Sequence, residues 1–167
     1  PRQRRDGAQP LTVVTQNLYA SETADPTRRV RAFADYLERA RPDIVAVQEL
    51  MPWNAKLLLS SEAVRRLYPL AEADLLGGGE TTPWTYVLSR WPRLERRRGP
   101  GIGDWRGLDV QRLNVSGAAL TVASAHFTAD ECPTRSVEDS GADDAPCPGG
   151  AARAADLDEA LRILERV

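Results

Sequence analysis

The sequence lacks any uninterrupted apolar run of the roughly 18 to 20 residues that a membrane-spanning helix requires. It also lacks a segment with the basic, apolar and small-residue regions of a signal peptide. No membrane span is therefore expected. Methionine is nearly absent, because Met51 is the only one, and the chain begins with Pro1. We therefore expect that an upstream segment has been removed.

A strong excess of charge of either sign is also missing. The chain has 22 Lys and Arg residues against 24 Asp and Glu residues, a net charge of -2, and its pI is near 5.5. This balance provides no general attraction to nucleic acid or to an anionic membrane. At 167 residues the chain is long enough to form one domain with a substantial core.

Cysteine occurs only twice, as Cys132 and Cys147, within one polar segment that contains no histidine to complete a zinc site. We therefore predict a disulfide between them, which requires an oxidising compartment. Closing a loop of this size would stabilise the fold by about 3 kcal/mol. The pair favours a secreted or extracytoplasmic protein, and two free thiols in a cytosolic loop are the alternative.

The segment over residues 41–49, RPDIVAVQE, contains the clearest strand of the sequence. Pro42 ends any preceding helix, and the β-branched apolar run that follows is typical of a strand buried on both faces. Gln48 and Glu49 come directly after it, at a sheet edge where layered α/β proteins place ligand sites. Burying an unpaired carboxylate is unfavourable, so Glu49 is either paired with an arginine or bound to a metal ion.

The remaining pattern predicts one domain over residues 11–167, after a flexible lead-in over residues 1–10. Strands are predicted over residues 11–18, 44–47, 70–76, 84–89, 93–98, 108–115 and 118–126, and helices over residues 25–41, 52–67 and 151–167. Residues 128–150 are predicted to form a long acidic loop. The first strand, helix and strand form a right-handed crossover, so Asn17 and Glu49 should lie close together at the two strand ends.

Three predicted strands end in polar side chains, namely Asn17, Glu49 and His126, the only histidine of the chain. Each has an ordinary alternative: a turn residue, half of an ion pair, or a histidine satisfied at a strand end. Together they offer oxygen ligands for a hard cation such as Mg²⁺ and a donor for a phosphoryl oxygen. No nucleophile elbow or Ser/His/Asp arrangement is visible, so the pattern favours phosphoryl transfer over acyl transfer.

Four segments resemble successive blocks of the endonuclease/exonuclease/phosphatase superfamily, which includes deoxyribonuclease-like and sphingomyelinase-like phosphodiesterases. They are TQNL (residues 15–18), RPDIVAVQEL (41–50), VLSRWP (87–92) and ASAHF (123–127). The resemblance implies an α+β fold, a layered α/β sandwich, and hydrolysis of phosphate esters. It implies Glu49 as the ligand of Mg²⁺, with Mn²⁺ or Ca²⁺ as alternatives, Asn17 as a supporting residue at that metal, and His126 as a donor to the scissile phosphate.

The chain departs from the family pattern after His126. The Gly-Asp-x-Asn block and the terminal Asp-His pair of the family have no counterpart, so the resemblance covers the amino-terminal part and implies an incomplete sandwich. Catalytic groups that act as a unit lose most of the rate when some are absent, so we expect the chain alone to be inactive. We also expect an exposed apolar face that a partner chain or a second copy covers. A non-catalytic binding module with the same fold is the alternative function.

The resemblance implies a phosphate-ester substrate, for which the sequence suggests two classes. Five arginines could follow a nucleic-acid backbone, or they could protect a solvated edge strand, and Arg90 is the candidate substrate-binding residue among them. They are Arg90, Arg93, Arg96, Arg97 and Arg98. The acidic loop close to His126 would repel a polyanion. We therefore expect a small or lipid-linked phosphate ester.

Overall fold

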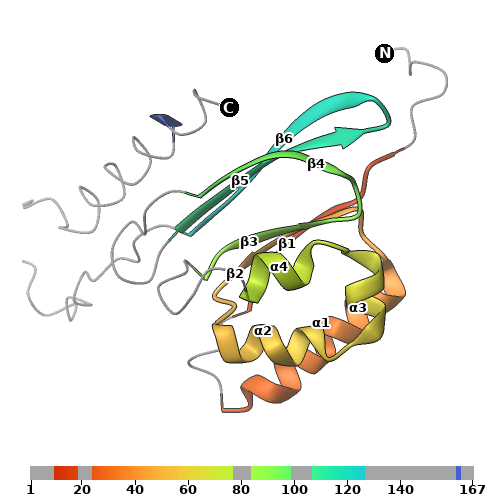
Figure 1. The fold of residues 1–167 in the computed structure, drawn as a ribbon. Coiled ribbons are helices and arrows are strands. Elements are labelled where there is room, and N and C mark those ends of the chain that lie inside the picture. The colour runs from red at the N-terminus through yellow and green to blue at the C-terminus, as the bar shows by residue number, and fades with distance from the viewer. Residues whose placement is uncertain (1–9, 19–23, 77–83, 99–106, 127–160, 163–167) are drawn as a thin grey trace, which may run out of the picture.

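Two three-stranded sheets lie face to face, and four helices cover the outer side of the first sheet (Figure 1). The computed structural model describes residues 10–18, 24–76, 84–98, 107–126 and 161–162. Its elements are, in chain order, β1 (Val13–Asn17), α1 (Pro26–Ala40), β2 (Ile44–Gln48), α2 (Pro52–Leu59), α3 (Glu62–Leu67), α4 (Ala71–Leu76), β3 (Tyr86–Ser89), β4 (Arg93–Arg98), β5 (Gly107–Val115) and β6 (Ala118–His126). This mixed α+β arrangement of stacked layers agrees with the predicted fold class.

The first sheet has the order β1-β2-β3, and α1 is the crossover between its two parallel strands. Asn17 is level with Gln48 in the register of β1 and β2, so both strands end at the same edge of the sheet. The predicted crossover is therefore confirmed. β3 runs antiparallel to β2.

The ends of α1 follow from its sequence. The Asp25 side chain accepts a hydrogen bond of 2.9 Å from the Arg28 backbone N–H, and Pro26 occupies the first turn, where its missing N–H has no consequence. The helix ends at Arg41, whose φ of 48° is left-handed, directly before Pro42. The helix therefore begins and ends where the sequence predicts.

The second sheet has the order β4-β5-β6 and is antiparallel throughout. Ser116 and Gly117, with φ of 52° and 87°, join β5 to β6. Positive φ at both positions is typical of a two-residue type I′ turn, whose twist matches that of the strands. The predicted hairpin is confirmed, and β4 is an edge strand as predicted.

Two predicted elements are wrong. Residues 71–76 form helix α4 instead of a strand, because Ala71, Asp74 and Leu75 are buried at the spacing of one helical face. The single helix expected over residues 52–67 is two helices, because Ser61 caps α3 by accepting a hydrogen bond from the Val64 backbone N–H.

Most of the apolar core lies between the helices and the first sheet. A smaller cluster between the sheets is centred on Ile44, Val87 and Leu113. Buried polar side chains share the space between the sheets, among them Gln48, Asp109, Gln111 and Ser124. Within this polar layer, Gln48 and Ser124 join β2 to β6, which carry the candidate site, whereas Asp109 and Gln111 join β5 to β3.

Several predictions lie outside the described residues: the Cys132–Cys147 disulfide, the acidic loop over residues 128–150, nearly all of the lead-in, and most of the helix over residues 151–167. Within the described ranges, no helix is both long enough and apolar enough to cross a membrane.

Candidate active site at the strand ends

Asn17, Glu49 and His126 meet at one edge of the stacked sheets. The Asn17 Nδ2 atom donates a hydrogen bond of 2.7 Å to Oε1 of Glu49, and Nε2 of His126 lies 3.2 Å from the same oxygen. These side chains come from the end of β1, from the residue after β2, and from the end of β6. The predicted juxtaposition is therefore present.

The backbone of Glu49 turns sharply out of β2. Its φ of 56° is left-handed, a conformation that costs a non-glycine residue of order 1–3 kcal/mol. Hydrogen bonds on both sides hold the turn: the Leu18 N–H donates to Gln48 O at 3.0 Å, and the Leu50 N–H donates to Trp84 O at 3.1 Å. The turn directs the carboxylate toward Asn17 and His126, with 16% of the side chain exposed.

The side chains that meet at this edge suit a hard cation. Glu49 Oε1 receives both contacts, and no hydrogen bond to its Oε2 is present in the described part of the chain. The described residues contain no group of three or more His, Cys, Asp or Glu side chains able to hold a metal. Mg²⁺ commonly binds one or two carboxylates and completes its shell with water and substrate phosphate. One carboxylate beside an amide and an imidazole fits that pattern.

A pair of buried residues, Gln48 and Ser124, lies directly beneath this site. Gln48 Nε2 donates to Ser124 Oγ at 2.9 Å and to Thr15 Oγ1 at 3.3 Å, and Ser124 Oγ donates to Val47 O at 3.4 Å. Sequence reasoning missed Ser124. Its signal was a polar residue in an apolar strand, on the same face as His126 two positions later.

Arg90 does not join the cluster. Its guanidinium lies 3.5 Å from Oδ1 of Asp43 and donates to Arg41 O at 3.2 Å. Asp43 precedes β2 whereas Glu49 follows it, so Arg90 lies at the opposite end of that strand.

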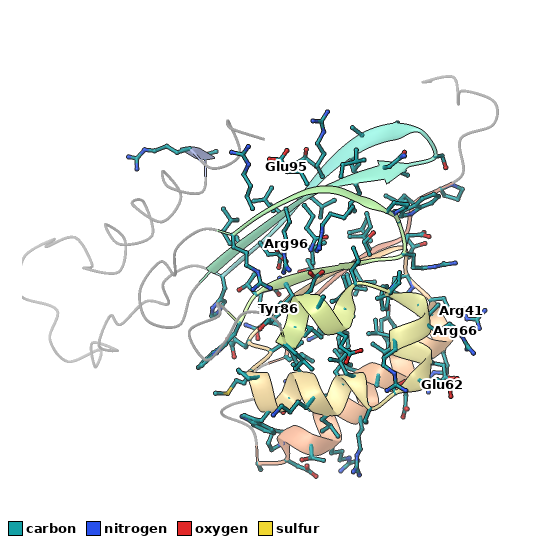
Figure 2. The ribbon with its side chains drawn as sticks, in the orientation of Figure 1. Arg41, Glu62, Arg66, Tyr86, Glu95 and Arg96 are labelled. Atoms are coloured by element: carbon teal, nitrogen blue, oxygen red, sulfur yellow. The ribbon has the colours of Figure 1, made fainter. Side chains whose placement is uncertain are left out.

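The arginines of β4 divide between an inward-facing set and Arg97, which lies on the outer side and pairs with Glu95. Glu95 lies on the outer side of β4, whereas Arg96 points into the space between the sheets (Figure 2). Arg93 and Arg96 both bind the buried carboxylate of Asp74 on α4, and Arg96 also binds Asp109, which is fully buried. The interpretation as a phosphate-binding strip was wrong because Arg93 and Arg96 face inward, toward acids from distant segments. The charged edge is present only in part, as the outward pair of Arg97 and Glu95.

This packing changes the pKa of two arginines, Arg96 and Arg98. Burial lowers the pKa of Arg96, but the hydrogen bonds and charge of Asp109 outweigh it, so the pKa is raised overall. Arg98 donates to Asp74 O at 2.6 Å and lies 5.4 Å from the ring centre of Tyr86. Its pKa is lowered by burial and by the neighbouring charge of Arg96. These cations contribute to packing between α4 and the second sheet.

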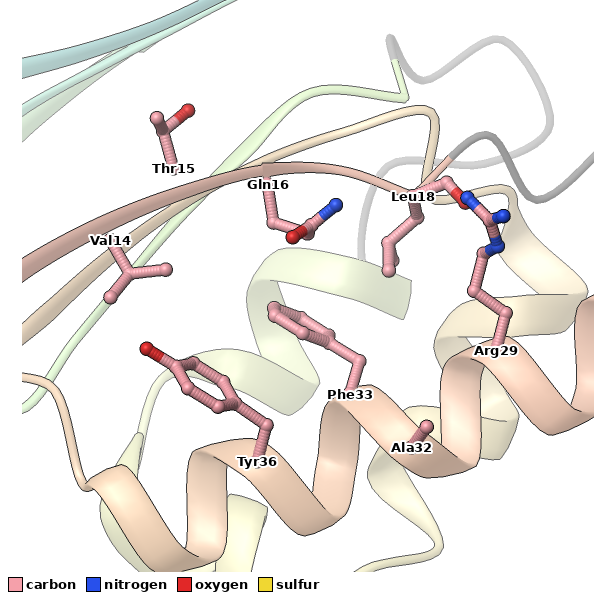
Figure 3. Close-up of a pocket in the computed structure, with 8 residues that line it drawn as sticks. All are labelled: Val14, Thr15, Gln16, Leu18, Arg29, Ala32, Phe33 and Tyr36. Atoms are coloured by element: carbon pink, nitrogen blue, oxygen red, sulfur yellow. The ribbon is translucent and has the colours of Figure 1, made fainter.

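A groove of about 510 Å³ lies between β1 and α1 (Figure 3). Neither Glu49 nor His126 lines it, so it is distinct from the strand-end cluster. Its lining residues are Val14, Thr15, Gln16, Leu18, Arg29, Ala32, Phe33 and Tyr36. Within the described ranges, β1 forms an outer edge of the first sheet, and the groove is open beside it.

Comparisons with known proteins identify the family and the fold. The model of the Endonuclease/Exonuclease/phosphatase family matches residues 14–166. No curated protein sequence matches the chain. Among solved structures, TDP2 from D. rerio, complexed with a single-strand DNA product, is similar with 22% identity and a TM-score of 0.59 over 75% of this chain and 49% of that one.

Two further solved structures share the fold. Sphingomyelinase C from Streptomyces griseocarneus has 21% identity and a TM-score of 0.58, over 91% of this chain and 56% of that one. SmcL has 16% identity and a TM-score of 0.61, over 93% of this chain and 58% of that one. The chain therefore spans about half the length of the structures it matches.

Proposed function

Because the chain belongs to the endonuclease/exonuclease/phosphatase family, we propose that it carries the metal-binding part of a Mg²⁺-dependent hydrolase of phosphate esters. The observation that supports this most directly is the contact of Asn17 and His126 with one oxygen of Glu49, at 2.7 and 3.2 Å. A structural ion pair would need no second polar strand end, whereas a phosphoryl site needs both an anionic ligand and a donor.

Each residue has a distinct role in this proposal. Glu49 holds the ion, for which Mn²⁺ or Ca²⁺ are alternatives, and Asn17 orients the carboxylate through its amide. A bound Mg²⁺ supplies positive charge for the phosphoryl oxygens and lowers the pKa of coordinated water. His126 donates its Nε2–H to a phosphoryl oxygen once the carboxylate is occupied by the ion.

The proposal includes a second half of the family fold, which this chain does not span. β1 and β6 are outer strands of their sheets within the described residues, and Gln48 bonds to both, so their open edges lie on one side of the molecule. Neither strand contains Lys, Arg, Asp or Glu. We place the remaining strands of the fold, from further polypeptide, a partner chain or a second copy, at these edges, and we expect negligible hydrolysis by the 167 residues alone.

The proposed substrate is a small or lipid-linked phosphodiester. The arginines of β4 support this choice over a long polyanion, because Arg93 and Arg96 are already bound to Asp74 and Asp109 and provide no track for a backbone. We also propose an extracytoplasmic location for the protein, as the pair of Cys132 and Cys147 suggests.

The metal site can be tested through the single histidine, whose ring gives one assignable set of NMR signals. Mn²⁺ broadens the signals of nuclei close to it, so titration of Mn²⁺ into the chain should broaden the His126 signal, and excess Mg²⁺ should restore it. Glu49→Gln should abolish this broadening. Glu38→Gln, which changes an exposed carboxylate of α1, is the matched control and should leave it unchanged.

Broadening that survives Glu49→Gln would refute the metal role of Glu49. Hydrolysis is assayed with sphingomyelin vesicles, single-stranded DNA and bis(4-nitrophenyl) phosphate, with and without Mg²⁺. Rapid Mg²⁺-dependent turnover by the 167 residues would refute the need for a second half. If a longer polypeptide that adds this half binds Mn²⁺ but hydrolyses none of the three, the binding module is favoured.

A further inference from the structure

The two residues beneath the strand-end cluster connect the two sheets. Gln48 belongs to β2 in the first sheet and Ser124 to β6 in the second, and both are at least nine-tenths buried. The Ser124 hydroxyl accepts a hydrogen bond from Gln48 Nε2 at 2.9 Å and donates to Val47 O at 3.4 Å. The serine hydroxyl therefore acts as both donor and acceptor across the gap between the sheets.

The position of this pair in sequence links it to the site. Gln48 immediately precedes Glu49, and Ser124 lies two residues before His126. Residues two apart on a strand point to the same face, about 7 Å apart, so a contact that fixes Ser124 also fixes the height and direction of His126. The apolar cluster between the sheets contains Ile44, which begins β2 and lies at the other end of the strand from Glu49.

We propose that Gln48 and Ser124 are positioning residues that hold His126 against Glu49. Without their hydrogen bonds, the end of β6 has no polar attachment to β2 in the described part of the chain other than the His126–Glu49 contact itself. The consequence of this inference for catalysis rests on the proposed function. The Gln48–Ser124 pair would explain how a donor and a metal ligand from separate sheets keep a fixed separation. The contact between the two side chains can be tested without any metal.

The first experiment uses no metal. Glu49→Gln should shift the ring signals of His126 in the wild-type background, because the neighbouring carboxylate charge is lost. When Glu49→Gln is made in the Ser124→Ala background, the His126 ring signals should shift by less than half as much. In the Ser124→Thr background, which keeps the hydroxyl, the full shift should return. Val122→Ala, on the same face of β6, is the matched control and should preserve it.

The second experiment uses Mn²⁺ as the probe. In Ser124→Ala the affinity for Mn²⁺ should stay within about threefold of wild type, since Glu49 and Asn17 are intact. The broadening of the His126 signal should nevertheless fall several-fold, because the ring no longer keeps its distance from the ion. A merely structural role of Ser124 would weaken both readouts together or neither.

Specific outcomes overturn the inference. It is wrong if Ser124→Ala and Gln48→Met, an apolar replacement of similar size, both retain the full response of His126 to Glu49→Gln. It is also wrong if Val122→Ala loses that response as strongly as Ser124→Ala. If wild type binds no Mn²⁺ but the metal-free responses follow the expected pattern, the proposed function fails while the positioning role stands.

Discussion

Arg96 binds Asp109 through two parallel hydrogen bonds, from Nε to Oδ1 at 2.7 Å and from Nη2 to Oδ2 at 2.8 Å. Asp109 Oδ2 also accepts a hydrogen bond of 2.8 Å from the Val87 backbone N–H of the first sheet. This fully buried carboxylate therefore connects β4 and β5 to β3. It is a second polar connection between the sheets, and it lies next to the first, because Asp109 is directly opposite Ser124 in the register of β5 and β6.

Replacing Arg96 should be far more harmful than replacing its neighbour. Arg96→Met leaves Asp109 and Asp74 buried with fewer donors, so the free energy of unfolding should fall by roughly 3–5 kcal/mol. Arg97→Met, on the outer face of the same strand, breaks only a pair with Glu95 whose side chains are more than a third exposed, and should cost about 1 kcal/mol or less. Urea unfolding measures both, and equal losses would contradict the buried network.

Tyr68 should make unfolding sensitive to alkaline pH. Its hydroxyl donates to Pro42 O at 3.0 Å, and burial raises its pKa, as it does for Tyr86. Above about pH 10 the unfolded chain loses these phenolic protons first, so stability present below that pH is lost as the pH rises. Tyr68→Phe should cost about 1 kcal/mol at pH 7 and should reduce the alkaline decline. Urea unfolding from pH 8 to 11 tests this, and an undiminished decline in the variant would contradict it.

The hairpin turn offers a purely conformational prediction. A methyl group added at Gly117 would meet no atom within 4 Å, but its φ of 87° disfavours a side chain. Gly117→Ala should therefore lower the free energy of unfolding by about 1 kcal/mol through backbone strain alone. Ser116→Gly is the comparison, because it relieves a left-handed residue with φ of 52° and should cost little. Thermal unfolding of both variants decides whether backbone strain controls this turn, and a neutral Gly117→Ala would show that it does not.

Adding a second carboxylate at the site should separate metal affinity from stability. In Asn17→Asp a carboxylate replaces the amide that donates to Glu49, so two negative charges face each other. We expect a lower melting temperature in EDTA and tighter Mn²⁺ binding than in wild type. Calorimetric titration and melting with and without Mg²⁺ measure these effects. Weaker Mn²⁺ binding by Asn17→Asp would argue against an ion at this position.

Local signals made part of the fold predictable. The cap at Asp25, the break at Pro42 and the turn at Ser116 and Gly117 are each encoded within a few residues, and all three are confirmed. The same locality explains the juxtaposition of Asn17 and Glu49, because a right-handed crossover brings neighbouring strand ends together.

Long-range pairing explains what sequence reasoning missed. Arg96 binds Asp74 and Asp109, which are 22 and 13 residues away in the sequence. Ser124 binds Gln48 across 76 residues. The sequence near these residues does not indicate their partners, so it predicts solvent-facing arginines on β4. The helix α4 was misassigned for another reason, because a short apolar segment fits either a strand or a helix until its buried face is known.

The open edges of β1 and β6 lie on the same side of the molecule. The edge formed by β4 is rich in charge, which discourages pairing with another strand, whereas β1 and β6 carry no charged side chain of the Lys, Arg, Asp or Glu type. The fourth outer strand, β3, has four residues that are all buried, whereas β1 is largely exposed, so among the described residues β1 and β6 are the strands at which the two sheets can be extended. In concentrated solution the isolated chain should form pairs that close on themselves through this side, in preference to fibres that extend from both.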